Sequence, residues 1–258
     1  MAKIQYLIFT ILLQILNPNK AEPSSDLQRL FLEVNTDFLE FFKQKSPKDV
    51  VIRLYANWEI NYPAASTERS TDFAVTREKR PVEWSVSILS GYIQEELGGL
   101  DTHLLALCHE MGHHLGGEPY KTDDHGNIRW ASMEPQADYW ATKVCLPLFL
   151  KEHPKYLHFR KEIHREILRK CENELTSSGN NYLYCLFTAQ AALQMAKIHQ
   201  KYKLPMEPDE DPVDPILTDP TQARVLNRNE YPGNQCRFDT CFNGALQTKR
   251  PACWYPTN

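Results

Sequence analysis

Apolar residues recur at helical spacing near the start of the chain. Between residues 24 and 45 they lie three or four positions apart, at Leu27, Leu30, Phe31, Val34, Phe38 and Phe42. Residues at this spacing share one face of a helix, so the segment is predicted to be an amphipathic helix that covers the core. Ser25 precedes the first apolar position and is a residue type that caps helices.

Alternation of apolar and polar residues, the pattern of a strand, appears next. Residues 82–89 alternate over the length of one strand, so one face of it is predicted to be buried. Residues 49–55 are rich in β-branched side chains and predict a second strand, and residues 73–75 predict a third. The polar residues 56–71 predict a loop between these two.

The most apolar helix prediction covers residues 104–117. Its leucines are Leu104, Leu105, Leu107 and Leu115. Asp101 or Thr102 suits the N-cap position, and Gly116–Gly117 is predicted to end the helix. Cys108 is predicted to be a small buried residue inside it.

Further helices are predicted along the second half of the chain. Residues 132–145, 154–171 and 182–202 carry apolar residues at helical spacing. Residues 206–215 combine acidic residues with prolines, which predicts a loop or linker.

Length and charge narrow the class of protein. The 258 residues are enough to bury one sizeable core. The net charge is −4, and no basic cluster is interleaved with aromatic residues. These features argue against a nucleic-acid partner.

Residues 1–21 are predicted to be a secretory signal. Lys3 supplies the positive start, and the apolar residues 4–15 are too few to span a bilayer. Ala21 suits the last position before cleavage, and an uncleaved N-terminal anchor is the alternative. No later segment is long and apolar enough to cross a membrane, so we expect no stable membrane span after cleavage and a secreted or periplasmic location.

Seven cysteines fit an exported protein in an oxidising compartment. Cys236, Cys241 and Cys253 crowd the last part of the chain, where a bridge is predicted. A zinc knuckle is the competing interpretation, but it lacks a fourth ligand at the usual spacing. Cys171 and Cys185 flank a polar turn that a second bridge would close.

The central helix contains the pattern H-E-x-x-H, formed by His109, Glu110 and His113. Residues four apart lie on one face of a helix, so both imidazoles can point at one metal ion. Glu110 follows the first histidine and can reach a metal-bound water as general base. The alternative is a helix that carries these three residues by chance.

A catalytic zinc site needs three protein ligands and an open fourth position. Glu134 is the predicted third ligand. Asp138 lies one helical turn later and can accept the free ring N–H of a ligating histidine. His125 is a less favoured third ligand, and His114 points away from His113 and is predicted to support the site or lie at the surface.

His109-Glu110-Met-Gly-His113 followed by Glu134-Pro-Gln-Ala-Asp138 resembles the HtpX and CAAX-prenyl-protease type of gluzincin zinc metallopeptidase. The resemblance implies His109, His113 and Glu134 as Zn²⁺ ligands, Glu110 as the base and Asp138 as a partner of a ligating histidine. It also implies that the strand before the metal helix, residues 82–89, is a substrate-binding edge. An ordinary sheet strand without that role has equal weight.

A later segment, residues 217–225, resembles the histidine-proline and arginine motif of the same family. Asp219 stands where the family has histidine, so the group that holds the substrate or the oxyanion is unassigned. Arg224 is the candidate for that role, or it pairs with Asp138 or Asp219. The resemblance covers about residues 82–224 and suggests an exported branch that lacks the family's membrane helices.

These observations predict an α+β fold, mainly helical and zincin-like, with a small edge-exposed sheet beside the H-E-x-x-H helix. The expected division is a signal at 1–21, a metallopeptidase domain at 22–226 and a cysteine-bearing segment at 227–258. The expected function is an exported zinc metalloendopeptidase that acts on protein or peptide substrates through a Glu-activated, zinc-bound water. The alternatives are a non-proteolytic zinc-binding interaction or chaperone-like module and a zinc hydrolase of a non-peptide bond.

Overall fold

The computed structural model describes residues 26–70, 82–158, 162–175, 179–203, 212–228 and 231–256. The predicted signal at 1–21 and the predicted strand at 73–75 lie outside these residues. The described chain is an α+β protein with a small sheet and many helices, as predicted. Among the described helices, none has the length and apolar character needed to cross a membrane.

The elements follow one another along the chain with short connections. The strands are β1 (Val50–Asn57), β2 (Ala65–Arg69), β3 (Val82–Leu89), β4 (Tyr120–Thr122) and β5 (Ile128–Ser132). The α-helices are α2 (Asp26–Lys45), α3 (Gly91–Gln94), α4 (Leu100–Leu115), α5 (Glu134–Trp140), α6 (Leu146–Glu152), α7 (Arg165–Glu174), α8 (Asn180–Tyr202) and α9 (Asn234–Ala245). A π-helical turn, η1 (Ala141–Cys145), joins α5 to α6, and a 3₁₀ turn, η2 (Pro154–Tyr156), follows α6.

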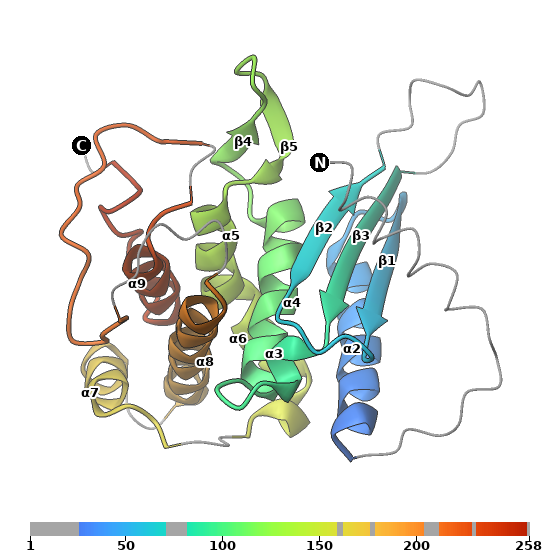
Figure 1. The fold of residues 1–258 in the computed structure, drawn as a ribbon, viewed down its shortest axis with the longest axis horizontal. Coiled ribbons are helices and arrows are strands. Elements are labelled where there is room, and N and C mark those ends of the chain that lie inside the picture. The colour runs from blue at the N-terminus through green and yellow to red at the C-terminus, as the bar shows by residue number, and fades with distance from the viewer. Residues whose placement is uncertain are drawn as a thin grey trace.

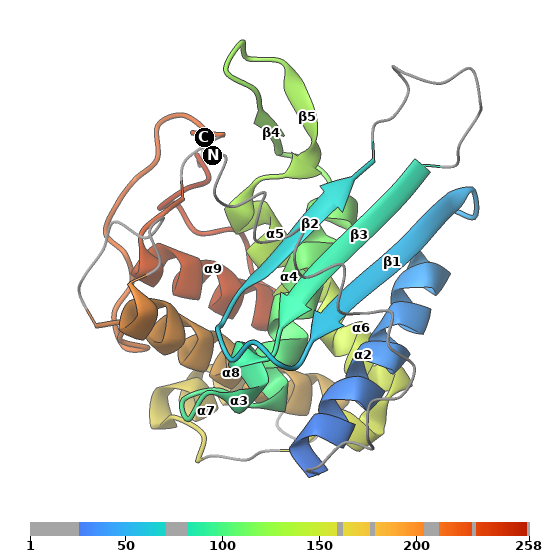
Figure 2. The same cartoon turned by 45° about the vertical axis from the view of Figure 1, so that its right-hand side comes forward.

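Helix α4 runs through the middle of the molecule. It lies between the sheet formed by β1, β2 and β3 on one side and helices α8 and α9 on the other (Figure 1). The turned view shows the hairpin of β4 and β5 standing above α5, at the end of α4 (Figure 2). Fourteen consecutive residues of α4 include almost no exposed side chain, which explains why its sequence is apolar on all sides.

The core is packed around α4 by side chains from several elements. Helix α2 buries Phe31, Phe38, Phe41 and Phe42, as its periodicity predicts. The rings of Phe38 and Phe41 lie 5.5 and 5.3 Å from the ring of Phe149 on α6. Helix α2 and helix α6 therefore close the core from the same side.

The three-stranded sheet has the order β1-β3-β2, with β3 parallel to β1 and antiparallel to β2. The alternation in β3 is confirmed, because Trp84, Val86 and Ile88 are buried. The prediction that residues 82–89 form a sheet edge is wrong, because β3 is the central strand. The prediction of a loop at 56–71 is also wrong in part, because β2 lies there and is an edge strand. Its sequence Ala65-Ser-Thr-Glu-Arg69 is polar because alternate side chains are exposed.

Most helix predictions are confirmed, with two differences. Residues 154–171 do not form one helix: a 3₁₀ turn at 154–156 precedes α7, where His164 Nδ1 accepts the Glu166 N–H and caps the helix. Helix α9 was not predicted. It buries Phe238 and Phe242 against α8 and α5, so the segment 227–258 contributes to the core.

Three disulfides connect elements that are distant in the sequence. The bridges Cys236–Cys253 and Cys171–Cys185 confirm the predictions for these cysteines. The prediction for Cys108 is wrong in its chemistry: it is buried, but it is bonded to Cys145 at the end of η1. This bridge joins α4 directly to the segment that continues α5. The seventh cysteine, Cys241, is buried and lies outside these bridges.

Removal of the Cys108–Cys145 bridge by a double substitution to alanine is expected to lower the free energy of unfolding strongly. The bridge closes a loop with a sequence separation of 37 residues, and loop-closure entropy then predicts a loss of about 4 kcal/mol. The matched control is the double alanine variant of Cys171 and Cys185, whose separation is 14 residues, with an expected loss of about 3 kcal/mol. Urea unfolding of both variants measures the difference, and an unchanged stability of the first variant would contradict the expectation.

Candidate metal centre

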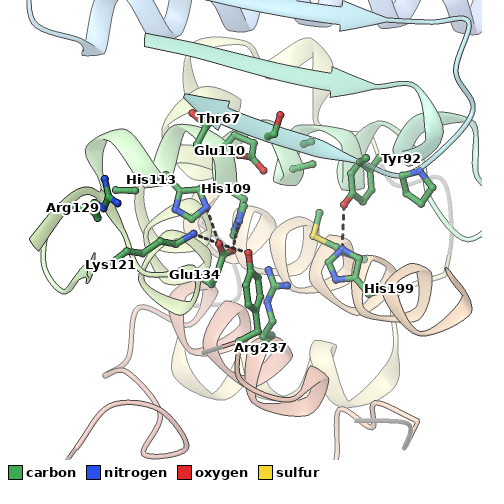
Figure 3. Close-up of a pocket in the computed structure, with 18 of the residues that line it drawn as sticks. Thr67, Tyr92, His109, Glu110, His113, Lys121, Arg129, Glu134, His199 and Arg237 are labelled. Atoms are coloured by element: carbon green, nitrogen blue, oxygen red, sulfur yellow. Dashed lines mark hydrogen bonds and ion pairs between the residues drawn. The ribbon is translucent and has the colours of Figure 1, made fainter. Parts of the chain in front are cut away.

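Helix α4 presents its two histidines and a glutamate to one cavity. His109 and His113 are one helical turn apart, and both are almost fully buried. Glu110 is also buried, and it lines the same cavity as the two histidines. Figure 3 shows Glu110 between the histidines and strand β2.

A close contact between two small residues brings the next helix against α4. A Cβ atom added at Gly112 would lie 2.8 Å from the carbonyl oxygen of Ala137, which real side chains do not tolerate. The glycine inside H-E-x-x-H and the alanine between Glu134 and Asp138 therefore let the backbones of α4 and α5 touch. Because the helices touch, the first residue of α5, Glu134, reaches the histidines of α4.

The donor atoms of His109, His113 and Glu134 converge within 4.8 Å of one another. His109 Nε2 is 3.1 Å from Glu134 Oε2, and His113 Nε2 is 3.5 Å from Glu134 Oε1. The structure thus brings together the three residues that the sequence suggested as metal ligands. All three are buried, and together they could hold a metal ion.

Each histidine has its other ring nitrogen engaged. His109 Nδ1 donates to Asp138 Oδ1 at 2.6 Å, and His113 Nδ1 donates to the carbonyl oxygen of Ser132 at 2.8 Å. A hydrogen bond at Nδ1 places the donor lone pair on Nε2, the atom that faces Glu134. This arrangement of the chain's own residues fits a metal ion.

Asp138 is paired with an arginine that the sequence did not indicate. Arg237 of α9 donates to both carboxylate oxygens, at 2.8 and 3.0 Å. Burial by itself would raise the pKa of the Asp138 carboxyl, but Arg237 and His109 outweigh burial and hold the pKa well below its usual value. Asp138 is therefore an ionised acceptor for the ring of His109.

Arg224 is placed elsewhere. It is exposed and is not among the residues that line the cavity. The suggested ion pair with Asp138 is made by Arg237 instead. No local motif marks Arg237, because it lies 99 residues from its partner.

Glu134 also contacts two groups outside α4 and α5. Lys121 of β4 forms an ion pair with Glu134 Oε1, and the hydroxyl of Tyr231 donates to the same oxygen at 2.7 Å. Tyr231 lies just before α9, so both ends of the chain after the metal helix converge on this carboxylate.

Burial and charge shift the ionisation of the central groups in opposite directions. Burial disfavours a charged ring, but the carboxylates of Asp138 and Glu134 outweigh it and raise the pKa of His109. Burial raises the pKa of Glu110, and only the neighbouring histidines oppose it. The surplus of buried carboxylate around His109 is a charge arrangement that a bound cation would balance.

The cavity has a volume of about 620 Å³ and runs along the metal-ligand residues. Residues 62–67, which include the start of edge strand β2, form one wall. Lys121 and Arg129 of the β4–β5 hairpin line one end, and Tyr92 and His199 line another part, with their side chains hydrogen bonded at 3.2 Å (Figure 3).

The remaining two histidines that the sequence raised do not join the ligands. His125 is exposed in the turn of the β4–β5 hairpin. His114 faces the other side of α4 and is stacked between Trp84 and Trp130, at 4.9 Å from each. Its Nε2 contacts Thr67 of β2, and Arg69 donates to its Nδ1 at 3.2 Å. His114 therefore attaches the edge strand to the metal helix.

Comparisons with protein-family models, with curated proteins and with solved structures found no match to this chain. The resemblance to HtpX-type metallopeptidases accordingly rests on the motif residues alone, and family membership stays a prediction.

Substitution of Arg237 by methionine is expected to weaken metal binding by about 10- to 100-fold, because the partners that orient a ligating histidine contribute that much. The variant removes the cation that keeps Asp138 ionised beside His109. Competition with a chelator measures the affinity. Arg224→Met is the matched control, and equal affinities in the two variants would show that the Arg237–Asp138 pair does not support the site.

Proposed function

We propose that this chain is an exported, zinc-dependent metalloendopeptidase that hydrolyses peptide bonds in protein or peptide substrates. The observation that carries the proposal is the convergence of His109, His113 and Glu134 beside Glu110 in one cavity. A zincin-like fold is part of the same proposal, since the motifs and the neighbouring sheet fit that class.

The donor set supports zinc as the metal. Two neutral imidazoles and one carboxylate are a frequent ligand set of catalytic zinc, and three protein ligands leave a fourth position open. When bound, zinc supplies Lewis acidity that activates water and polarises the scissile carbonyl. His109, His113 and Glu134 would hold it, and Asp138 would keep His109 in the required tautomer.

Glu110 is the proposed general base. It lines the cavity without belonging to the ligand set, and burial raises its pKa toward the working pH. Its carboxylate takes the proton of the attacking water and then delivers it to the leaving amine. A structural metal site would not need a carboxylate in this position.

Strand β2 supports a peptide as the substrate. It is a sheet edge within the described residues, and its own residues line the cavity beside the metal ligands. An extended peptide can add to such an edge through main-chain hydrogen bonds. The substrate-binding edge that the resemblance implied for residues 82–89 is thus proposed for residues 65–69.

The three disulfides support an oxidising compartment. Together with the predicted signal at residues 1–21, they support a secreted or periplasmic location.

The experiment that tests the function compares the zinc-loaded chain, the same chain treated with a chelator and the zinc-loaded Glu110→Gln variant. Each is incubated with a mixed peptide library and with a panel of esters. Cleavage of peptides by the first sample alone is the expected result. Cleavage of esters alone would favour a non-peptide hydrolase, and no cleavage by a zinc-containing chain would favour a non-proteolytic zinc-binding module.

A further inference from the structure

Peptide hydrolysis by the proposed mechanism needs a hydrogen-bond donor for the carbonyl oxygen that becomes negatively charged. Such a donor is worth about 10²- to 10³-fold in kcat. The sequence left this role open, because Asp219 replaces the family's histidine. The structure places Asp219 outside the residues that line the cavity, with its backbone N–H donating to Asp239 at 2.7 Å.

Several donors that line the cavity are bound to groups away from the ligands. Thr67 contacts His114 and donates to the carbonyl oxygen of Ser85. Tyr92 is bonded to His199, and Arg237 is bonded to Asp138. Two other lining residues, Lys121 and Tyr231, donate to the ligand Glu134 itself.

Charge distinguishes these two donors. The ammonium group of Lys121 is balanced by the Glu134 carboxylate in the present structure. A divalent metal would take over that carboxylate charge, and a cation beside a cation is repelled. The phenol of Tyr231 carries no charge, so the same repulsion does not displace it.

The C-terminal part of the chain holds Tyr231 in place. The ring lies 5.9 Å from both the Lys121 ammonium and the Arg237 guanidinium. Arg237 is anchored on Asp138, and the Cys236–Cys253 bridge ties the beginning of α9 to the segment behind it. The hydroxyl is therefore presented to the ligand set by a rigid support.

From this geometry we propose that Tyr231 is a catalytic residue whose hydroxyl donates a hydrogen bond to the substrate oxygen that gains negative charge. The inference rests on the proposed peptidase function. No covalent bond or proton transfer is involved: the phenol keeps its proton and moves from Glu134 Oε1 to the developing oxyanion.

The test uses the full chain loaded with one equivalent of zinc and its Tyr231→Phe variant. The probes are the peptide that the wild type cleaves fastest in a mixed library and the phosphinic analogue of that peptide, which is tetrahedral at phosphorus. We expect zinc content and KM to stay unchanged, kcat to fall by about 10²- to 10³-fold, and the phosphinic analogue to bind weaker by a similar factor in calorimetry.

Two variants make the result specific. Tyr202→Phe is the matched control, because the Tyr202 hydroxyl also donates to a carboxylate, that of Glu95, but lies outside the cavity. Lys121→Met tests the competing donor and is expected to have a smaller effect on the analogue than Tyr231→Phe.

Three results would overturn the assignment of Tyr231. These are an unchanged affinity for the phosphinic analogue, a loss of zinc that accounts for the lost turnover, or a larger loss in Lys121→Met than in Tyr231→Phe. A wild type that cleaves no peptide would instead remove the proposed function, and the assignment with it.

Discussion

Replacement of Glu110 by glutamine is expected to lower kcat on a peptide substrate by about 10³-fold, the usual contribution of a positioned general base. Glutamine keeps the size of the side chain but cannot accept the proton of the attacking water. The zinc content is expected to stay at about one per chain, because Glu110 is not one of the three converging donors. Steady-state kinetics and elemental mass spectrometry on the same preparation measure both quantities.

The control for this variant is Glu118→Gln, because Glu118 is exposed beyond the end of α4. It is expected to behave as the wild type. If Glu110→Gln cleaves peptides at the wild-type rate, Glu110 is not the base. If Glu110→Gln loses its zinc, the loss of turnover says nothing about proton transfer, and the residue belongs to the metal-binding set instead.

Replacement of Glu134 by alanine is expected to reduce the zinc content from about one per chain to a trace, since a catalytic zinc site depends on three protein ligands. The affinity should fall by more than the roughly 10- to 100-fold that the loss of a supporting partner costs. Two histidines on one helix remain, and Lys121 and Tyr231 lose their common acceptor. Chelator competition and circular dichroism separate the loss of metal from the loss of fold.

Two further variants complete this experiment. Glu134→Gln keeps an oxygen for Lys121 and Tyr231 but removes the charge, so it tests the ligand role if the alanine variant does not fold. His125→Ala is the control for the competing third ligand and is expected to keep its zinc, because His125 is exposed in the hairpin turn. Zinc retained in both Glu134 variants would assign the third ligand to another residue.

The sequence alone predicted the parts of the site that lie on helices. His109 and His113 share a face because the period of a helix places residues four apart together, and the structure shows both rings in one cavity. The same period relates Glu134 to Asp138, which contact the same histidine. Burial of β3 on one face followed from its alternation. These are local regularities, so a local pattern is enough to read them.

Other parts of the site depended on contacts between distant residues. The edge strand β2 has a short polar sequence, and only its pairing with β3 and its attachment to His114 make it a strand beside the cavity. The bridge from Cys108 to Cys145 was missed because a cysteine in an apolar helix has the pattern of a buried residue whether or not it is bonded.

The sequence by itself therefore determined the helix faces, the buried face of the central strand and the residue types that can hold a metal ion. The tertiary structure decided which strand borders the cavity and which side chains complete it. Arg237 and Tyr231 reach Asp138 and Glu134 from 99 and 97 residues away. Their positions follow from the packing of α9 on α5 and α8, and Gly112 and Ala137 set how closely α5 approaches α4. Periodicity describes one element at a time, whereas a site assembled from several elements is defined by how they pack.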